Sequence, residues 1–213
     1  ETENMLKKEC GNKPYLLIAD SLAVKEGETA SPTIQPDHRE IGRRLGEQLK
    51  TKKQKIGIIA DWKMSEAVQA EISGLTEALE GSGSEISWCI YRRKEQNITE
   101  RMKEETKADA LVILDPGVLE EFGEQAEHGK YKGAELYGVG YNLKTVALLD
   151  KGNIQGLVVP DGYEIGYKSV KEIAGKIEHK FYKMKGYTTE YQIFSKKDFS
   201  MDDDLERFLY SYE

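Results

Sequence analysis

Four predicted strands are each followed at once by a carboxylate or amide side chain. These side chains are Asp61, with Trp62 next to it, then Asp115, Asn142 and Asp161. Carboxylate and amide oxygens accept hydrogen bonds from hydroxyl groups, and an indole ring can stack on a flat apolar face. Such a set is typical of a binding site for a small polar solute. Asp and Asn are also good helix caps, so the same residues can have that structural role, Asp61 and Asp115 most readily.

The patterns that would indicate catalysis, a metal ion or a nucleotide are missing from the sequence. His38, His128 and His179 are scattered, without further ligands at metal-binding spacing, and no Gly-x-Ser-x-Gly sequence marks a nucleophile. The segment GSGSE at 81–85 follows a helix and precedes a strand, which is the reverse of the order in a phosphate-binding turn. We therefore expect no enzyme activity, no metal and no cofactor.

Composition and charge narrow the class of protein further. The net charge of −7 argues against nucleic acid as a partner, and the one basic run, at 50–55, is expected to be a solvated loop. No apolar stretch approaches the roughly 20 residues that span a bilayer. No signal peptide is visible, as expected of a mature or trimmed chain. Cys10 and Cys89 match no metal or redox motif, and their spacing leaves their disulfide state open.

Short apolar runs alternate with helical patterns along most of the chain. Most of the runs lack polar alternation, as strands covered on both faces do, so we expect an α/β fold with three layers: an open, mainly parallel sheet with helices on both faces. Right-handed crossovers place the carboxyl ends of such strands at one edge, where ligands bind. The predicted strands are 15–19, 56–60, 86–91, 110–114, 136–141 and 156–159, with a later one at 191–195.

Two segments interrupt this alternation. Residues 20–37 are rich in Gly, Pro, Ser and Thr, which predicts a linker or an extended crossing segment. At Pro160 and Gly162 the chain is built to leave the sheet, because proline cannot donate a ladder hydrogen bond. The helix that follows, from Tyr163 to about Phe181, should place an apolar face against a sheet. That face consists of Tyr167, Val170, Ile173, Ala174, Ile177 and Phe181.

Six segments in fixed order give the chain a recognisable resemblance. They are TIQPDHREIGRRLGEQL, KIGIIADWKMSEAVQAEISGLTEAL, ADALVILD, LYGVGYN, LLDKGNIQGLVVPDGYEIGYKSV and IFSKKDFS. The chain resembles the type 1 periplasmic sugar-binding proteins, whose core is shared with lactose-repressor-like regulators. The resemblance implies two lobes that are joined by three crossings and bind the ligand between them. The crossings would lie at about 20–36, at 160–162 and at about 186–189.

The resemblance also implies a division of the chain. Most of the family's first lobe has no counterpart here, as expected of a truncated protein, so the helix at 163–181 should lie on a makeshift surface or pack on a second molecule. A single lobe supplies half of the cleft, which predicts weak or no sugar affinity. The implied parts are 1–20 (last strand unit of an incomplete first lobe), 21–36 (crossing), 37–160 (complete second lobe), 161–188 (return helix of the first lobe) and 189–213 (strand and helix on the second lobe).

The ligand-binding residues that the resemblance implies depart from the family pattern. Glu71 stands where the family often has arginine, Asn142 where it often has aspartate, and Pro160 where it often has glutamine or asparagine. Arginine and aspartate are the usual partners of adjacent sugar hydroxyls, so these replacements argue against a pentose or hexose in the usual pose. The candidate set is Trp62, Glu71, Asp115, Asn142, Asp161 and Tyr163.

The function that this resemblance implies is binding of a small, carbohydrate-like solute by a solute-binding protein of an ABC transporter or by an extracellular sensor. Its partners would be a transporter permease or a sensor kinase, with a dimer through the exposed first-lobe surfaces as a further expectation. It would act in the periplasm, outside the cell or anchored on the outer face of a bacterial membrane. Two alternatives stay open: the effector domain of a repressor-like regulator, and a flavodoxin-like protein, whose phosphate loop ADSLAVKEGETASPT matches only loosely.

Overall fold

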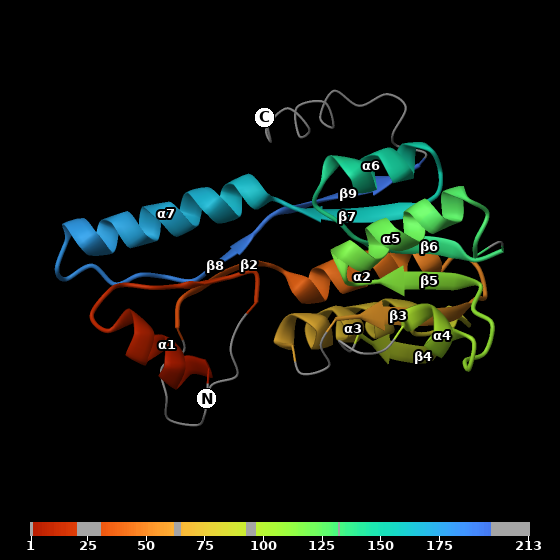
Figure 1. Ribbon diagram of the computed structural model, residues 1–213, viewed down its shortest axis with the longest axis horizontal. Helices are drawn as coiled ribbons and strands as arrows, with labels where there is room; N and C mark the ends of the chain where they lie inside the picture. Colours follow the sequence, from red (N-terminus) through yellow and green to blue (C-terminus); the bar gives the residue numbers. More distant parts are fainter. Residues whose placement is uncertain (1, 21–30, 62–64, 93–96, 132, 197–213) are drawn as a thin grey trace.

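The computed structural model describes residues 2–20, 31–61, 65–92, 97–131 and 133–196. Figure 1 shows a larger part, built on a six-stranded sheet, and a smaller part, built on a three-stranded sheet. The terminal helix predicted after residue 200 lies outside the described residues. Among the described helices, none combines the length and the apolar character that crossing a membrane requires.

The larger part has the three layers that the apolar runs predict. Its strands lie in the order β4-β3-β5-β6-β7-β9, and all are parallel except β9, which is antiparallel to β7. Helices α2 and α3 cover one face, and α4, α5 and α6 cover the other (Figure 1). The strands are β3 (Lys55–Ala60), β4 (Glu85–Tyr91), β5 (Ala110–Ile113), β6 (Glu135–Val139), β7 (Gly156–Pro160) and β9 (Tyr191–Ser195). The helices are α2 (His38–Leu49), α3 (Glu66–Leu79), α4 (Ile98–Met102), α5 (Pro116–Glu127) and α6 (Leu143–Asp150).

Burial on both faces explains why the strands read as continuous apolar runs. Every residue of β5 is buried, and so is every residue of β3 after Lys55. Alternate residues of these strands belong to two separate apolar cores: Ile59 and Ile113 lie on the α5/α6 side, and Ile58 and Val112 lie on the α2/α3 side. Polar alternation would bury a polar side chain on one of these faces at a cost.

Helices α2 and α3 pack with their backbones in close contact. A methyl group on Gly42 would overlap the carbonyl oxygen of Glu71, and one on Gly74 would overlap that of Arg39. Only glycine, which has no Cβ, allows two helices to approach this closely at the point where they cross. This packing fixes both helices on the sheet and, with them, their amino-terminal ends.

The smaller part contains β1 (Leu17–Ile18), β2 (Thr33–Pro36) and β8 (Tyr187–Thr189), which pair in the parallel order β1-β2-β8. Strand β1 is shorter than the run predicted at 15–19, and β2 lies within the segment predicted as an extended crossing. Helix α7 (Gly162–Glu178) contacts β2 and β8, and α1 (Thr2–Cys10) lies on the opposite side of this sheet (Figure 1).

Helix α7 does not use the apolar face that its spacing predicts. The face turned to the small sheet carries Ile165, Ser169 and Glu172, whereas Val170 and Ile177, on the predicted face, are about 70% exposed. The cause is a hydrogen-bonding centre at Glu172, which is 1% exposed. Its carboxylate accepts hydrogen bonds from Tyr182 Oη, Tyr187 Oη and Lys185 N, each at 2.8 Å.

Three connections join the two parts, and each is a single residue. Asp37 links β2 to α2, Asp161 links β7 to α7, and Glu190 links β8 to β9. The last two lie side by side, because the Asp161 N–H donates to the Glu190 carbonyl oxygen at 3.0 Å. The parallel strands of the large sheet therefore end at the side where the smaller part begins.

Candidate ligand-binding edge of the large sheet

Five polar side chains follow the carboxyl ends of five adjacent strands. In the order β4-β3-β5-β6-β7 these are Arg92, Asp61, Asp115, Asn142 and Asp161. Neighbouring strands in a sheet lie about 4.8 Å apart, so the five residues form a row, which we call the polar edge. Because the connection at Asp161 leaves from this row, the polar edge faces the smaller part of the molecule.

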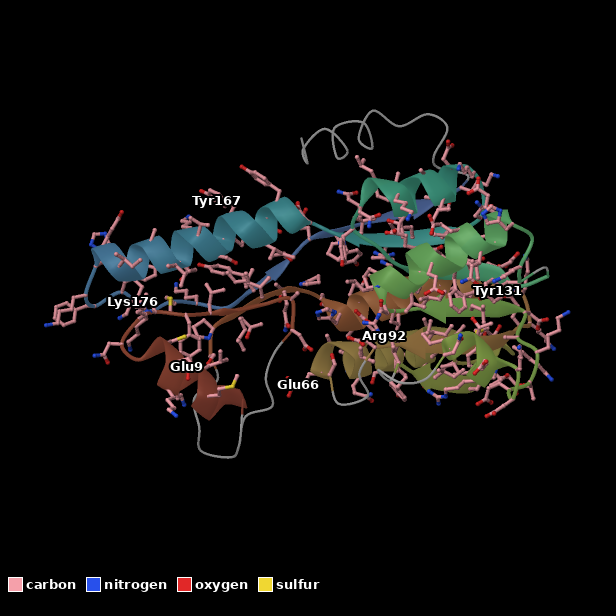
Figure 2. The ribbon with its side chains drawn as sticks, viewed as in Figure 1. Glu9, Glu66, Arg92, Tyr131, Tyr167 and Lys176 are labelled. Carbon is pink, nitrogen blue, oxygen red and sulfur yellow. The ribbon has the colours of Figure 1, made fainter. Side chains whose placement is uncertain are left out.

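The polar edge contains an ion-pair network centred on Arg92. Arg92 Nε lies 3.2 Å from Asp61 Oδ1, and Arg92 Nη2 lies 3.1 Å from Asp115 Oδ2. The Asp115 side chain is 7% exposed, whereas those of Arg92 and Asp61 are about half exposed. Figure 2 labels Arg92 at the side of the large part that faces the small part. A guanidinium held by one buried and one exposed carboxylate keeps donors available to an incoming oxygen.

Helix capping accounts for three of the predicted ligand residues. Asp115, Asn142 and Asp161 accept hydrogen bonds from the backbone N–H groups of Val118, Thr145 and Glu164, at 3.0, 2.9 and 2.8 Å. Asp61, which the sequence also suggests as a cap, does not cap α3. Ser65 has that role, because its hydroxyl accepts from Val68 N at 3.2 Å. The carboxylate of Asp61 therefore takes part in the polar edge.

Both polar atoms of the Asn142 side chain already form hydrogen bonds. Besides capping α6, its Nδ2 donates to Glu120 Oε2 at 2.9 Å, and Lys144 Nζ lies 2.6 Å from the other Glu120 oxygen. Lys144 and the Asn142 amide hold the pKa of Glu120 below its usual range. Asn142 is thus a positioning group for the ends of α5 and α6, and a ligand would have to compete for its amide.

Next to Asn142 lies Tyr141, an aromatic side chain that the sequence analysis did not single out. It is 60% exposed and lies two residues after the end of β6. Tyr163, which the resemblance places in the ligand set, is 66% exposed and stacks on Tyr167 along α7, with ring centroids 6.4 Å apart. Trp62 lies outside the described residues.

Glu71 is separated from the polar edge. It is buried within α3, where its Oε1 lies 2.7 Å from His38 Nδ1, while His38 Nε2 lies 2.7 Å from the Ala19 carbonyl oxygen. Burial opposes the charged form of His38, but the hydrogen bond and the charge of Glu71 outweigh it and raise the His38 pKa. Burial likewise raises the Glu71 pKa. The pair ties α2 and α3 to the segment after β1, where Asp20 also accepts from Ser65 Oγ at 2.7 Å.

This pair predicts that stability falls as the pH rises above about 6.5, the ordinary pKa of histidine. Below that pH His38 is protonated in both the folded and the unfolded protein, so its pairing with Glu71 makes its full contribution to the free energy of unfolding. As the pH passes through the raised pKa of the folded state, that contribution is lost. We expect the urea midpoint to decrease over this range. The decrease should be smaller in His38→Gln and unchanged in His128→Gln, and equal slopes in all three proteins would contradict this assignment.

Among the described residues, no three His, Cys, Asp or Glu side chains are grouped closely enough to hold a metal ion. Neither Cys10 nor Cys89 forms a disulfide within the described part of the chain. The polar edge presents three carboxylates, an amide and a guanidinium, and the exposed phenol of Tyr141 lies beside it; these groups are suited to hydrogen bonding and stacking.

No protein-family model and no curated protein sequence matches the chain. Solved structures do. GanP, a glucose-galactose binding protein from Geobacillus stearothermophilus, is 20% identical, with a TM-score of 0.73 over 93% of this chain and 72% of that one. The fold is that of the type 1 periplasmic binding proteins. The Caulobacter myo-inositol binding protein bound to myo-inositol is 15% identical, with a TM-score of 0.76 over 96% of this chain and 72% of that one. The TorS sensor domain–TorT complex, in the presence of TMAO, is 17% identical, with a TM-score of 0.72 over 96% and 71%.

Three of the residues proposed from the sequence, Asp115, Asn142 and Asp161, lie at one edge of the large sheet, and the same edge carries Arg92 and Tyr141, which were not proposed. Arg92 directly follows the run predicted at 86–91, but only carboxylate and amide side chains were selected after the strands, so its guanidinium was passed over. Tyr141 was missed because it was assigned to the predicted strand at 136–141, whereas β6 ends at Val139. His38 carried no signal, since its role depends on a contact with Glu71, a residue of another helix.

Proposed function

We propose that this chain binds a small, sugar-like polar solute at the polar edge, between its two parts, and acts as a solute-binding protein or sensor component. The observation that carries the proposal is the Arg92 network, in which one guanidinium bridges Asp61 and the buried Asp115. Adjacent hydroxyl groups suit this arrangement, because Arg donates two parallel hydrogen bonds and a carboxylate accepts several. Tyr141 adds an exposed ring beside the row, on which a sugar face can stack.

The proposed site also uses Asp161 and, from the sequence analysis, Trp62. Glu71, a residue of α3, is left out of the proposed site because its carboxylate is paired with His38 of α2. Asn142 and Tyr163 have lesser roles here, since the first holds helix ends and the second lies on α7.

We propose that the two parts are lobes that close on the solute by hinge motion. One lobe would comprise residues 37–160 and the strand from 191, and the other would comprise 1–20, 31–36 and 161–189, which carry β1, β2, α7 and β8. The three connections at Asp37, Asp161 and Glu190 would absorb the change in backbone angles. Affinity would then come from contacts made only in the closed state.

The similar structures named above support a binding role over catalysis and over a repressor effector domain. The TorS sensor domain–TorT complex favours a sensor protein as one class of partner, with a transporter permease as the other. Either partner would place the chain in the periplasm or outside the cell. A solute that reaches the polar edge there would be handed on or signalled without being changed.

A titration followed by two-dimensional NMR tests the proposal. We expect D-glucose, D-galactose or myo-inositol to perturb the backbone signals of residues 61, 92, 115 and 141, with weak affinity. Absence of any perturbation at high sugar concentration would refute the proposal, and so would perturbation confined to other elements.

A single substitution should weaken this binding selectively. Arg92→Ala is expected to raise the dissociation constant about tenfold or more, because it removes charge-assisted hydrogen bonds worth about 1.5–3 kcal/mol. Lys52→Ala is the matched control, since Lys52 forms an exposed ion pair with Glu135 at the opposite edge of the same sheet. Equal affinities of the two variants would argue against the polar edge as the site.

A further inference from the structure

Helix α7 carries its apolar residues on the side opposite to the small sheet. Tyr163, Tyr167, Val170 and Ile177 are 66, 56, 71 and 70% exposed, whereas Glu172, on the other side of the helix, is buried. Figure 2 shows Tyr167 pointing away from the small sheet. Exposed large apolar side chains in one line along a helix mark an interaction surface.

The spacing of this line indicates what kind of surface it is. The residues at 163, 167, 170, 174 and 177 alternate steps of four and three, which is a strict period of 3.5. Phe181, 91% exposed, continues the same spacing after the helix ends. A helix that packs on a globular core shows a wider apolar face, whereas a stripe with this narrow period is typical of a seam between two paired helices.

We propose that this seam pairs with the α7 of a second copy of the chain, antiparallel, to form a dimer. A twofold axis perpendicular to the helices near residue 168 places Tyr163 opposite Ala174 of the second copy, and Tyr167 opposite Val170. Each tyrosine then faces a smaller side chain over the overlap from 163 to 174, and Ile177 and Phe181 extend beyond it.

Charges beside the seam select this register. Glu164 and Lys171 lie on the same flank of the stripe, and an antiparallel twofold brings equal flanks together. In the proposed register Glu164 lies within one turn of Lys171 of the second copy, twice by symmetry. In the alternative register, shifted by one heptad, the twofold axis lies near residue 172. Lys171 would then lie beside Lys171 of the second copy, and Glu164 beside Glu178 of the second copy, so like charges would meet. Glu164 Oε1 already lies 2.6 Å from Lys168 Nζ, so the second copy adds a cation to an existing pair.

Sedimentation velocity of the purified chain over a range of concentrations tests the dimer. We expect a reversible dimer whose dissociation constant rises about tenfold or more in Val170→Glu, because the substitution buries a carboxylate at the seam. Since Val170 is exposed in the single chain, circular dichroism and melting of this variant should match the wild type. Leu143→Glu, at a 56% exposed apolar residue of the large part, is the control and should leave the dimer intact. A wild-type chain that stays monomeric, or a dimer that survives Val170→Glu, would overturn the proposal.

Disulfide trapping tests the register. In a Cys10→Ser, Cys89→Ser background, the double variant Tyr163→Cys, Ala174→Cys should form a covalent dimer on mild oxidation. Tyr163→Cys alone should not, because its two copies would be separated by about 16 Å along the helix axis, or 11 residues at 1.5 Å each. Efficient cross-linking of the single variant, or none of the double variant, would refute the antiparallel register. None of the residues in the Arg92 network takes part, so the result is independent of the proposed solute site.

Discussion

Replacing Gly74 with alanine should lower the free energy of unfolding by about 3 kcal/mol or more. The added methyl group would overlap the carbonyl oxygen of Arg39 and approach Arg43 N at 2.9 Å. Both obstacles are backbone atoms of α2, which cannot move aside as a side chain can. Relief would require α2 and α3 to separate along their whole contact and would open the core beneath them. Urea unfolding, followed by circular dichroism, measures the loss.

Replacing Gly166 with alanine should instead raise the free energy of unfolding. Gly166 lies inside α7, and a methyl group there would meet no atom within 4 Å. Alanine is favoured over glycine in a helix interior by about 0.8–1 kcal/mol, so a small gain in stability is expected. Similar losses in Gly74→Ala and Gly166→Ala would show that the close contact of α2 with α3 does not set the cost.

Replacing Glu172 with alanine should destabilise the packing of α7 on the small sheet by about 4.5 kcal/mol or more, because hydrogen bonds to a charged group contribute about 1.5–3 kcal/mol each and three are lost here. Burial opposes ionisation of Glu172, but the Lys185 N–H and the hydroxyls of Tyr182 and Tyr187 outweigh it and lower its pKa. Without the carboxylate, these donors lose their acceptor. Hydrogen exchange of the α7 amides should become faster, while exchange in β3 and β5 should change little.

A second glutamate on the same helix provides the control. Glu178→Ala, at the exposed end of α7, should change stability by no more than about 0.5 kcal/mol. If α7 exchanges at the wild-type rate in Glu172→Ala, the helix must be held by its apolar contacts, and the assignment of Glu172 as its anchor would be wrong.

Sequence patterns predicted the large part well because its strands obey one simple rule. A strand covered on both faces must be apolar at nearly every position, as β3 and β5 are, so composition alone locates it. The starts of three helices could also be predicted from the sequence, because Asp115, Asn142 and Asp161 each provide the acceptor that the first turn of a helix needs.

Contacts between residues far apart in the sequence could not be predicted from these patterns. Periodicity identified the apolar stripe of α7 but could not tell whether it faces inward, because the choice depends on tyrosines 10 and 15 residues beyond Glu172. Similarly, Glu71 was assigned to the ligand by its position in a resemblance, whereas its buried carboxylate is paired with His38. Neither the contacts of Glu172 nor the contact of Glu71 with His38 can be recognised from the spacing of neighbouring residues in the sequence.

The three one-residue connections restrict how the two parts can move. Each connection offers two free backbone torsions, and the ladder bond between Asp161 and Glu190 couples those of two connections. In the hinge motion proposed above, the change in backbone angles would be shared by Asp37, Asp161 and Glu190. The contacts of His38 with the Ala19 carbonyl oxygen and of Ser65 with Asp20 also join the two parts, so this motion would have to keep or exchange them.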